Sequence, residues 1–171
     1  MHYGRINFND IGNGIGIRTS IFVSGCRNRC EQCFNPETWD FNYGTLFTME
    51  TEKKIFDSMD EYHHGITILG GDPLEPENSE TLYHFVKKFK ELFPDKSIWL
   101  YTGYKYEFIL GLRNDDFRKR LMFAVDIVVD GRYLWQEADI SLKFKGSRNQ
   151  RIIDIKKTVE RHPYKEPVVI G

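Results

Sequence analysis

The three cysteines of the chain, Cys26, Cys30 and Cys33, lie in one short stretch, SGCRNRCEQCFN, with polar residues between them. Cysteines that only fill a core have apolar neighbours instead. Three crowded cysteines also cannot build a disulfide framework for a chain of 171 residues. We therefore expect cysteines that bind a metal centre or are themselves reactive.

Two kinds of metal centre suit three thiolates. A closed zinc site takes four ligands, so zinc would need one more ligand, such as His2, His63 or His64. A short loop can instead wrap three thiolates round three corners of a compact 4Fe-4S cluster. The fourth iron would then remain open, which in an enzyme makes it a coordination site. A zinc-binding or electron-transfer module without catalysis stays the alternative from a different functional class.

The segments around the cysteines predict an α/β fold. Short β-branched or aromatic runs predict strands at residues 18–24, 65–69, 97–101 and 124–129. Apolar residues spaced three and four apart predict a helix over residues 82–92 that ends before Pro94, and weaker patterns predict helices around Ile55 and Phe117. Strands that alternate with helices indicate a mainly parallel sheet, either open or curved into part of a barrel.

An unusual segment follows each predicted strand. These segments are Gly25-Cys26, GGDP at residues 70–73, TGY at 102–104 and DGR at 130–132. Because the carboxyl ends of parallel strands meet at one edge of a sheet, we expect the four segments to form one site. The pair Gly70-Gly71 would let the backbone approach a small zwitterion closely, although a tight turn is the plain alternative for GGDP and for DGR. Asp130 and Arg132 stand two apart, so in extended backbone they would face the same way.

The sequence after Arg132 carries weaker patterns. Residues 140–144 and 151–155 are expected to form a further pair of strands around the turn-like segment 145–149. We expect one domain over residues 1–171, with its core over about residues 1–155 and a C-terminal tail over residues 156–171.

Charge and hydropathy narrow the class of partner. The 24 basic and 25 acidic side chains give a formal net charge of -1, so no electrostatic footprint indicates binding to nucleic acid or to an anionic membrane. The first residues lack the pattern of a secretion signal, and no apolar run approaches the roughly 18 residues of a membrane span. We expect a cytoplasmic protein whose partner is a protein or a small molecule.

The spacing of the cysteines resembles that of the radical S-adenosylmethionine (SAM) enzymes. Further segments narrow the resemblance: NGIGIR (13–18), CFNPETW (33–39), GGDPL (70–74), WLYTGY (99–104), VDGRY (129–133) and GSRNQR (146–151). In this order they are similar to the activating enzymes of anaerobic (class III) ribonucleotide reductase. The resemblance covers nearly the whole chain up to Arg151.

The resemblance implies a fold and a ligand set. The fold would be an incomplete radical SAM β/α barrel. Cys26, Cys30 and Cys33 would hold three irons of a 4Fe-4S cluster, while the amino and carboxylate groups of SAM chelate the fourth. The other residues implied in the SAM site are Gly70, Gly71 and Asp72 at its amino group, Asp130 and Arg132 at its carboxylate side, and Thr102 at its ribose. Asn13, Arg18 and Asn35 would line the site.

The resemblance also implies an activity and partners. An electron from the cluster would cleave SAM to methionine and a 5′-deoxyadenosyl radical, which takes a Cα hydrogen from a backbone glycine of the reductase. The site must then open toward a protein. A low-potential donor such as flavodoxin would supply the electron, since no cysteines remain for a second cluster. The alternatives within the enzyme class are an activase of another glycyl-radical enzyme and another small radical SAM enzyme.

Overall fold

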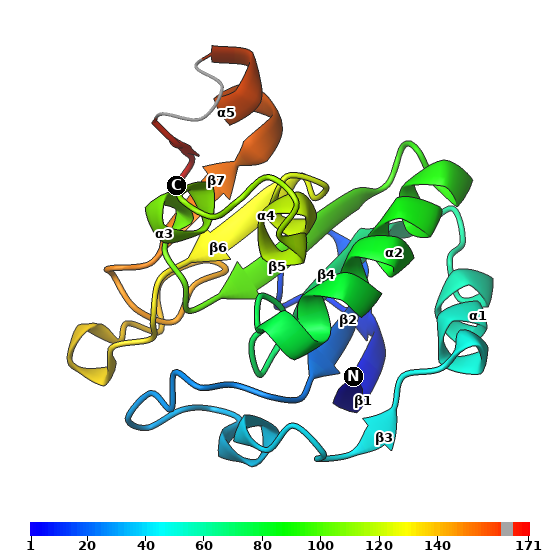
Figure 1. Cartoon of the computed structure of the whole chain (residues 1–171), viewed down its shortest axis with the longest axis horizontal. Helices are drawn as coiled ribbons and strands as arrows, with labels where there is room; N and C mark the ends of the chain where they lie inside the picture. Colours follow the sequence, from blue (N-terminus) through cyan, green and yellow to red (C-terminus); the bar gives the residue numbers. More distant parts are fainter. Residues whose placement is uncertain (162–165) are drawn as a thin grey trace.

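Eight strands form one sheet in the computed structural model, which describes residues 1–161 and 166–171. The strands are β1 (His2–Asp10), β2 (Ile17–Val23), β3 (Thr45–Leu46), β4 (His63–Gly70), β5 (Ser97–Thr102), β6 (Ile127–Asp130), β7 (Arg151–Asp154) and β8 (Val168–Val169). Their order across the sheet is β3-β1-β2-β4-β5-β6-β7-β8, so the sheet is open, with β3 and β8 at its edges (Figure 1).

The centre and the edges of the sheet differ in strand direction. The neighbours β2, β4, β5 and β6 run parallel, whereas β1 and β3 on one side and β7 and β8 on the other pair antiparallel. The prediction of a mainly parallel sheet is therefore right for the centre and wrong for the edges. β1 leads into β2 through residues 11–16 only, which is too short for the crossover that a parallel pair requires.

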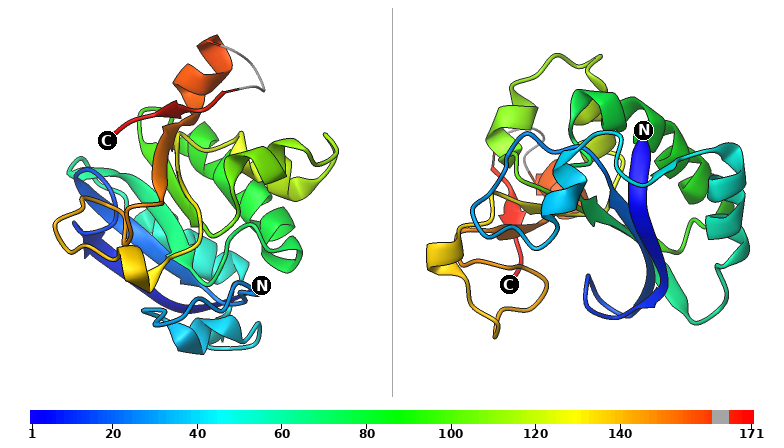
Figure 2. Two further views of the ribbon diagram at one scale, coloured as in Figure 1. Left: turned by 90° about the vertical axis from the view of Figure 1, so that its left-hand side faces the viewer. Right: turned by 90° about the horizontal axis from the view of Figure 1, so that it is seen from below.

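One face of the sheet is covered by helices (Figures 1 and 2). The helices are α1 (Met49–Asp57), α2 (Pro76–Leu92), α3 (Tyr106–Leu110), α4 (Phe117–Met122) and α5 (Ile155–Arg161), with short 3₁₀ helices at Pro36–Trp39 and Trp135–Glu137. The three predicted helices are confirmed, since α1 contains Ile55 and α4 begins at Phe117. The longest, α2, buries Phe85 and Phe89 in the main core and ends at Leu92, before Pro94.

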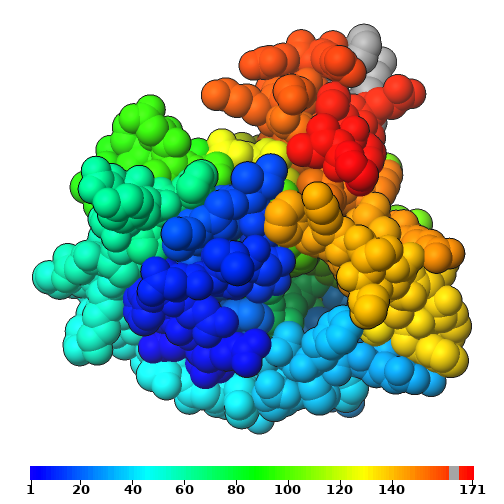
Figure 3. All heavy atoms as spheres, turned by 180° about the vertical axis from the view of Figure 1, so that it is seen from behind, coloured from blue at the N-terminus to red at the C-terminus, as the bar shows by residue number. Residues whose placement is uncertain are grey.

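The alternation of side chains gives the sheet two different faces. Ile21 and Val23 of β2 pack under the helices in the main core. Trp99 of β5 and Val129 of β6 face the other side, in a smaller apolar cluster that Phe144 joins. On this second face the molecule is hollowed between the amino-terminal strand, the cysteine segment and the chain that follows β6 (Figure 3).

The carboxyl ends of the four central strands meet at one edge, as predicted. Val23 at the end of β2 pairs with Gly70 of β4, and Thr102 of β5 pairs with Asp130 of β6. Residues 24–35, here called the cysteine loop, leave the sheet at this edge. The sheet therefore presents the ends of several strands to the three cysteines.

Other parts of the chain differ from their prediction. Residues 140–144 form turns rather than a strand, because Asp139 accepts hydrogen bonds from the amides of Ser141 and Leu142 and so stabilises a local turn. β7 pairs with β6 and β8 instead. Much of the expected tail forms α5 and β8, and its residues 162–165 lie outside the described residues.

Across the described residues, no helix combines the length and the apolar character needed to cross a membrane.

Candidate functional site

A cavity of about 480 Å³ lies where the strand ends meet the cysteine loop. This volume is within the range of small-molecule sites. The predicted site residues that line it are Cys26, Cys30, Cys33, Asn13, Asn35, Gly70, Gly71, Asp72 and Thr102. Arg18, Asp130 and Arg132 are not among the lining residues. The structure thus brings most of the predicted site together around one space.

The backbone of the cysteine loop bends sharply between its cysteines. Arg29 and Gln32 have φ angles of +43° and +54°, which turn the chain within the spacers that separate the cysteines. The amide of Cys33 donates to the carbonyl of Cys30 at 3.2 Å, and the amide of Asn35 donates to the Cys33 sulfur at 3.4 Å. All three thiols are free and half-buried at the cavity wall.

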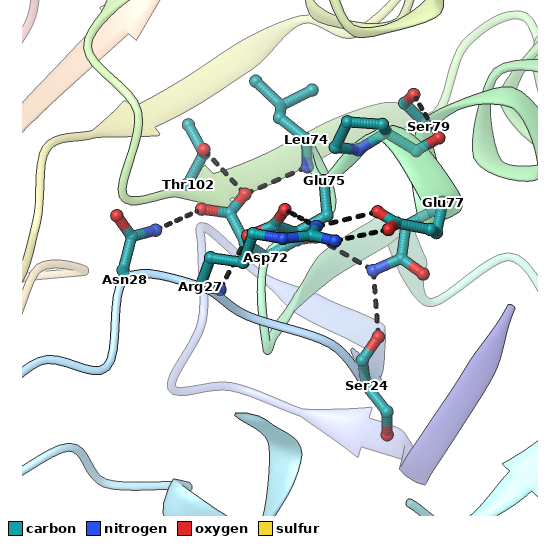
Figure 4. Close-up of polar contacts among 11 residues, drawn as sticks. Ser24, Arg27, Asn28, Asp72, Leu74, Glu75, Glu77, Ser79 and Thr102 are labelled. Carbon is teal, nitrogen blue, oxygen red and sulfur yellow. Dashed lines mark hydrogen bonds and ion pairs between the residues drawn. The ribbon is translucent and has the colours of Figure 1, made fainter. Parts of the chain in front are cut away.

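The amino end of α2 anchors the start of the cysteine loop (Figure 4). Glu75 is fully buried, and its carboxylate accepts from the amide of Arg27 at 2.7 Å and from its guanidinium at 2.6 Å. Glu77 accepts from the same guanidinium at 2.5 Å. The side-chain amide of Asn78 donates to the carbonyl of Ser24 at 2.9 Å. These contacts fix the direction in which the loop leaves β2.

Asp72 joins several segments of the site (Figure 4). One carboxylate oxygen accepts from the amide of Leu74 at 2.9 Å and from the hydroxyl of Thr102 at 2.8 Å. The other accepts from the side-chain amide of Asn28 at 2.8 Å and from the amide of Gly103 at 2.9 Å. Burial raises the pKa of Asp72 to about 6 against the effect of these bonds, so the carboxyl is ionised at neutral pH. Because each oxygen already accepts two hydrogen bonds, the group is better suited to organise the site than to bind an ammonium directly.

The chemistry of the three thiols fits an iron-sulfur cluster. Burial, and then the charge of Asp72, raise the pKa of Cys26 to about 11, so this thiol ionises readily only beside a cationic centre. Binding of a metal supplies that positive charge. Three thiols at one cavity wall, with a backbone amide directed at the sulfur of Cys33, are the donor set that a 4Fe-4S cluster with one open iron requires.

A single metal ion finds a poorer set of ligands. Within residues 1–161 and 166–171, no three histidine, cysteine or acidic side chains gather closely enough to hold one ion. His63 lies at the amino end of β4, where its ring nitrogens contact Asp60 and the carbonyl of Phe8, each at 2.7 Å. His2, His63 and His64 do not line the cavity that contains the thiols.

Arg18 is buried away from the cavity, so its prediction as a site-lining residue is wrong. Its guanidinium donates to the hydroxyl of Thr67 at 2.7 Å, to the hydroxyl and the carbonyl of Ser97 at 3.0 and 2.7 Å, and to two further carbonyls. These bonds use all its donors to tie β2 to β4 and β5. Asn13 from the same segment does reach the cavity, and its carbonyl accepts from Thr67 at 2.7 Å.

Asp130 and Arg132 do not face the same way, so that prediction is also wrong. Gly131 between them has a φ angle of +100°, which breaks the alternation of an extended chain. Asp130 is buried, accepts from the backbone of α3 at 2.8 Å, and forms an ion pair with Arg151 at 2.5 Å. Arg132 instead reaches the cysteine loop and donates to the carbonyl of Asn28.

Several residues of the site escape prediction from the sequence. Those that line the cavity include Arg5, Phe22, Trp39, Tyr101, Tyr133 and Gln150. Phe22 and Tyr101 could be inferred from strand alternation once the cavity face is known. Asn28 and Glu75 could not, because their importance comes from contacts with segments far away in the sequence.

Comparison with known proteins identifies the family. Residues 12–153 match the family model described as a 4Fe-4S single cluster domain. A protein of Haemophilus influenzae is 38% identical over 155 residues, which cover 89% of this chain and 97% of the relative. A protein of Enterobacteria phage T4 is 41% identical, and the match covers 89% of this chain and 93% of the relative. A protein of Escherichia coli K12 is 36% identical, and the match covers 88% of this chain and 96% of the relative. All three are named anaerobic ribonucleoside-triphosphate reductase-activating protein. Because the matches run through the cysteine loop and nearly the whole length of the relatives, the chain belongs to the family of anaerobic ribonucleoside-triphosphate reductase-activating proteins.

Proposed function

We propose that this protein is the activating enzyme of an anaerobic ribonucleotide reductase, on which it installs a glycyl radical. The observation that carries the proposal is the gathering of Cys26, Cys30 and Cys33 around one cavity at the carboxyl ends of the central strands. The name of the relatives supplies the protein that is activated.

The chain's own residues would bind and orient the reacting groups. Cys26, Cys30 and Cys33 would hold a 4Fe-4S cluster and leave one iron for SAM. Gly70 and Gly71 line the cavity beside the cysteines, where they would contact SAM. When bound, the cluster and SAM would supply the chemistry of reductive SAM cleavage.

The sheet supports the further proposal that the fold is an incomplete radical SAM barrel. The parallel strands β2, β4, β5 and β6 with their helices are the kind of unit from which β/α barrels are built. Antiparallel strands flank this unit on both sides, so no further β/α units close it within residues 1–161 and 166–171. The hollow in Figure 3 would then be the accessible interior of such a partial barrel.

The substrate glycine would enter through this open side. Phe34 lines the cavity, is 74% exposed, and packs on Tyr133 with ring centroids 5.0 Å apart. An exposed aromatic side chain such as Phe34 beside the cavity suits contact with a protein surface. A separate low-potential donor such as flavodoxin would supply the electron, because one cluster uses all three cysteines of the chain.

Reductase-dependent cleavage of SAM tests this proposal. Anaerobically reconstituted protein, mixed with a strong reductant, SAM and an anaerobic ribonucleotide reductase, should release methionine and 5′-deoxyadenosine in equal amounts and activate the reductase. The Cys30→Ala variant is the matched control and should release neither product. Cleavage stimulated only by a different glycyl-radical enzyme would overturn the assignment of the reductase. A reconstituted protein that cleaves no SAM would overturn the enzymatic assignment itself.

A further inference from the structure

Asn28 stands where the cysteine loop meets the segments that follow three strands. It lies midway between Cys26 and Cys30 in the sequence. Its side-chain amide donates to Asp72, after β4, at 2.8 Å. Its carbonyl accepts from Arg132, after β6. Its side chain also rests against Gly103, after β5. One residue of the loop is therefore held from three sides.

The contact with Gly103 leaves no room for another side chain. A β-carbon at Gly103 would stand 2.7 Å from Cγ of Asn28 and still closer to its side-chain nitrogen. The amide of Gly103 also donates, at 2.9 Å, to the oxygen of Asp72 that receives Asn28. The loop and the end of β5 thus share one acceptor atom, and neither can move without affecting the other.

Asp72 holds the loop through its backbone as well. Its amide donates to the carbonyl of Gly25 at 2.8 Å, immediately before Cys26. Because Asp72 is fully buried and each of its oxygens is engaged twice, displacing it would break several hydrogen bonds at once. A shift of the end of β4 would therefore move Gly25, which precedes Cys26. It would also move Asn28 in the middle of the loop.

We propose that Asn28 is a positioning residue for the cysteines, and that its bond to Asp72 couples occupancy of the SAM site to the placement of Cys26 and Cys30. This inference rests on the proposed function, since it takes the cavity to hold a cluster and SAM. A ligand lying against the ends of β4 and β5 contacts the segments that carry Asp72 and Gly103. If such a ligand fixes the position of Asp72, the hydrogen bond from Asn28 to Asp72 also fixes the position of the cysteine loop.

The first experiment measures thiol reactivity in the full chain before the cluster is introduced. Asn28→Ala should speed alkylation of Cys30 by iodoacetamide about tenfold, the factor that corresponds to one lost hydrogen bond, because a released loop exposes a thiol that is now half-buried. Asn114→Ala is the matched control, since Asn114 is exposed and lies in the turn between α3 and α4. Circular dichroism and thermal melting establish that both variants are folded.

The second experiment measures SAM affinity of the reconstituted holoenzyme by calorimetry. Asn28→Ala and Asp72→Asn should each raise the dissociation constant about tenfold. If Asn28 and Asp72 act on SAM through their one shared contact, the dissociation constant of the double variant should be no higher than the higher of the two single-variant values. A lower iron uptake by folded Asn28→Ala would support the proposal equally, because misplaced cysteines bind the cluster poorly.

Two outcomes would overturn the proposal. The first is an Asn28→Ala variant whose alkylation rate and SAM dissociation constant both equal those of the wild type. The other is additive losses in the double variant, which would mean that Asp72 acts on SAM independently of Asn28. A wild-type holoenzyme that binds no SAM would instead count against the proposed function. The alkylation rates would still decide whether Asn28 positions the cysteines.

Discussion

The backbone of Gly71 packs against the carbonyl of Gly25, the residue before Cys26. A β-carbon at Gly71 would stand 2.6 Å from that oxygen and 2.9 Å from the carbonyl oxygen of Thr38. The close approach that this glycine permits is therefore to the protein's own cysteine loop. We expect Gly71→Ala to displace the loop and to lower the free energy of unfolding by about 1 to 3 kcal/mol through overpacking. Urea unfolding and the iron content after reconstitution measure the two effects.

Gly111→Ala is the control for this substitution. Gly111 caps α3 with a φ angle of -69°, and a β-carbon there meets nothing closer than 3.5 Å. Alanine should raise the free energy of unfolding at this position by about 0.4 to 1 kcal/mol, because it restricts the unfolded chain without strain in the folded one. Equal losses from the two substitutions would contradict the role assigned to Gly71.

Removal of the Arg27 side chain should loosen the cysteine loop from α2. Arg27→Ala leaves the buried carboxylate of Glu75 with the backbone amide of residue 27 but without its ionic partner. We expect the free energy of unfolding to fall by about 1 to 3 kcal/mol, measured by urea unfolding. Arg113→Ala removes a surface-exposed ion pair with Asp115 and should have no measurable effect. A neutral result for Arg27→Ala would show that the ion pair does not hold the loop.

Local patterns were enough to predict the elements that position the site. The apolar spacing of α2 and the glycine-rich segments after β4 and β6 can be recognised in the sequence, because both depend on residues close together in the chain. β1 could not be recognised in this way. Its residues are exposed or half-buried at the side of the sheet, and two register irregularities interrupt its pairing with β2. Such a strand lacks the regular alternation on which prediction depends.

Side-chain directions beyond the strand ends were less predictable. A spacing of two places Asp130 and Arg132 on one side only in extended backbone, and the positive φ angle of Gly131 removes that condition. Arg18 was expected in the site because its segment, NGIGIR, resembles that of the family, yet its guanidinium forms hydrogen bonds within the sheet. The role of Asn28 depends on partners that only the folded chain brings together.

Ionisation of the buried Asp72 carboxyl should lower the free energy of unfolding at neutral pH. Its pKa in the folded protein is raised to about 6 from its usual value of 3.8, so the cost is fully present above pH 6 and disappears as the pH falls toward 4. Between pH 7 and pH 4.5 the wild type should therefore gain about 2 kcal/mol of unfolding free energy relative to Asp72→Asn. Urea unfolding of both cluster-free chains at the two pH values measures the gain. A difference that stays constant with pH would mean that the carboxylate does not titrate in this range.

Each cysteine should be required for the cluster. The wild type should bind about four irons and four sulfides, and Cys26→Ala, Cys30→Ala or Cys33→Ala should each lose the visible absorption of the cluster. All three thiols lie at the cavity wall, so the variants should keep the circular dichroism spectrum of the wild type. Iron and sulfide analysis checks the stoichiometry. A variant that retains a full cluster would remove its cysteine from the ligand set.

Electron paramagnetic resonance of the reductase after anaerobic mixing with this protein, SAM and reductant tests the central claim most directly. A glycyl radical couples to the hydrogen that remains on its Cα atom, so the account predicts a doublet on the reductase. Reductase made with glycine deuterated at Cα should give a signal in which this splitting collapses. Cleavage of SAM without any such signal on the reductase would contradict the claim that the reductase is the protein activated at this site.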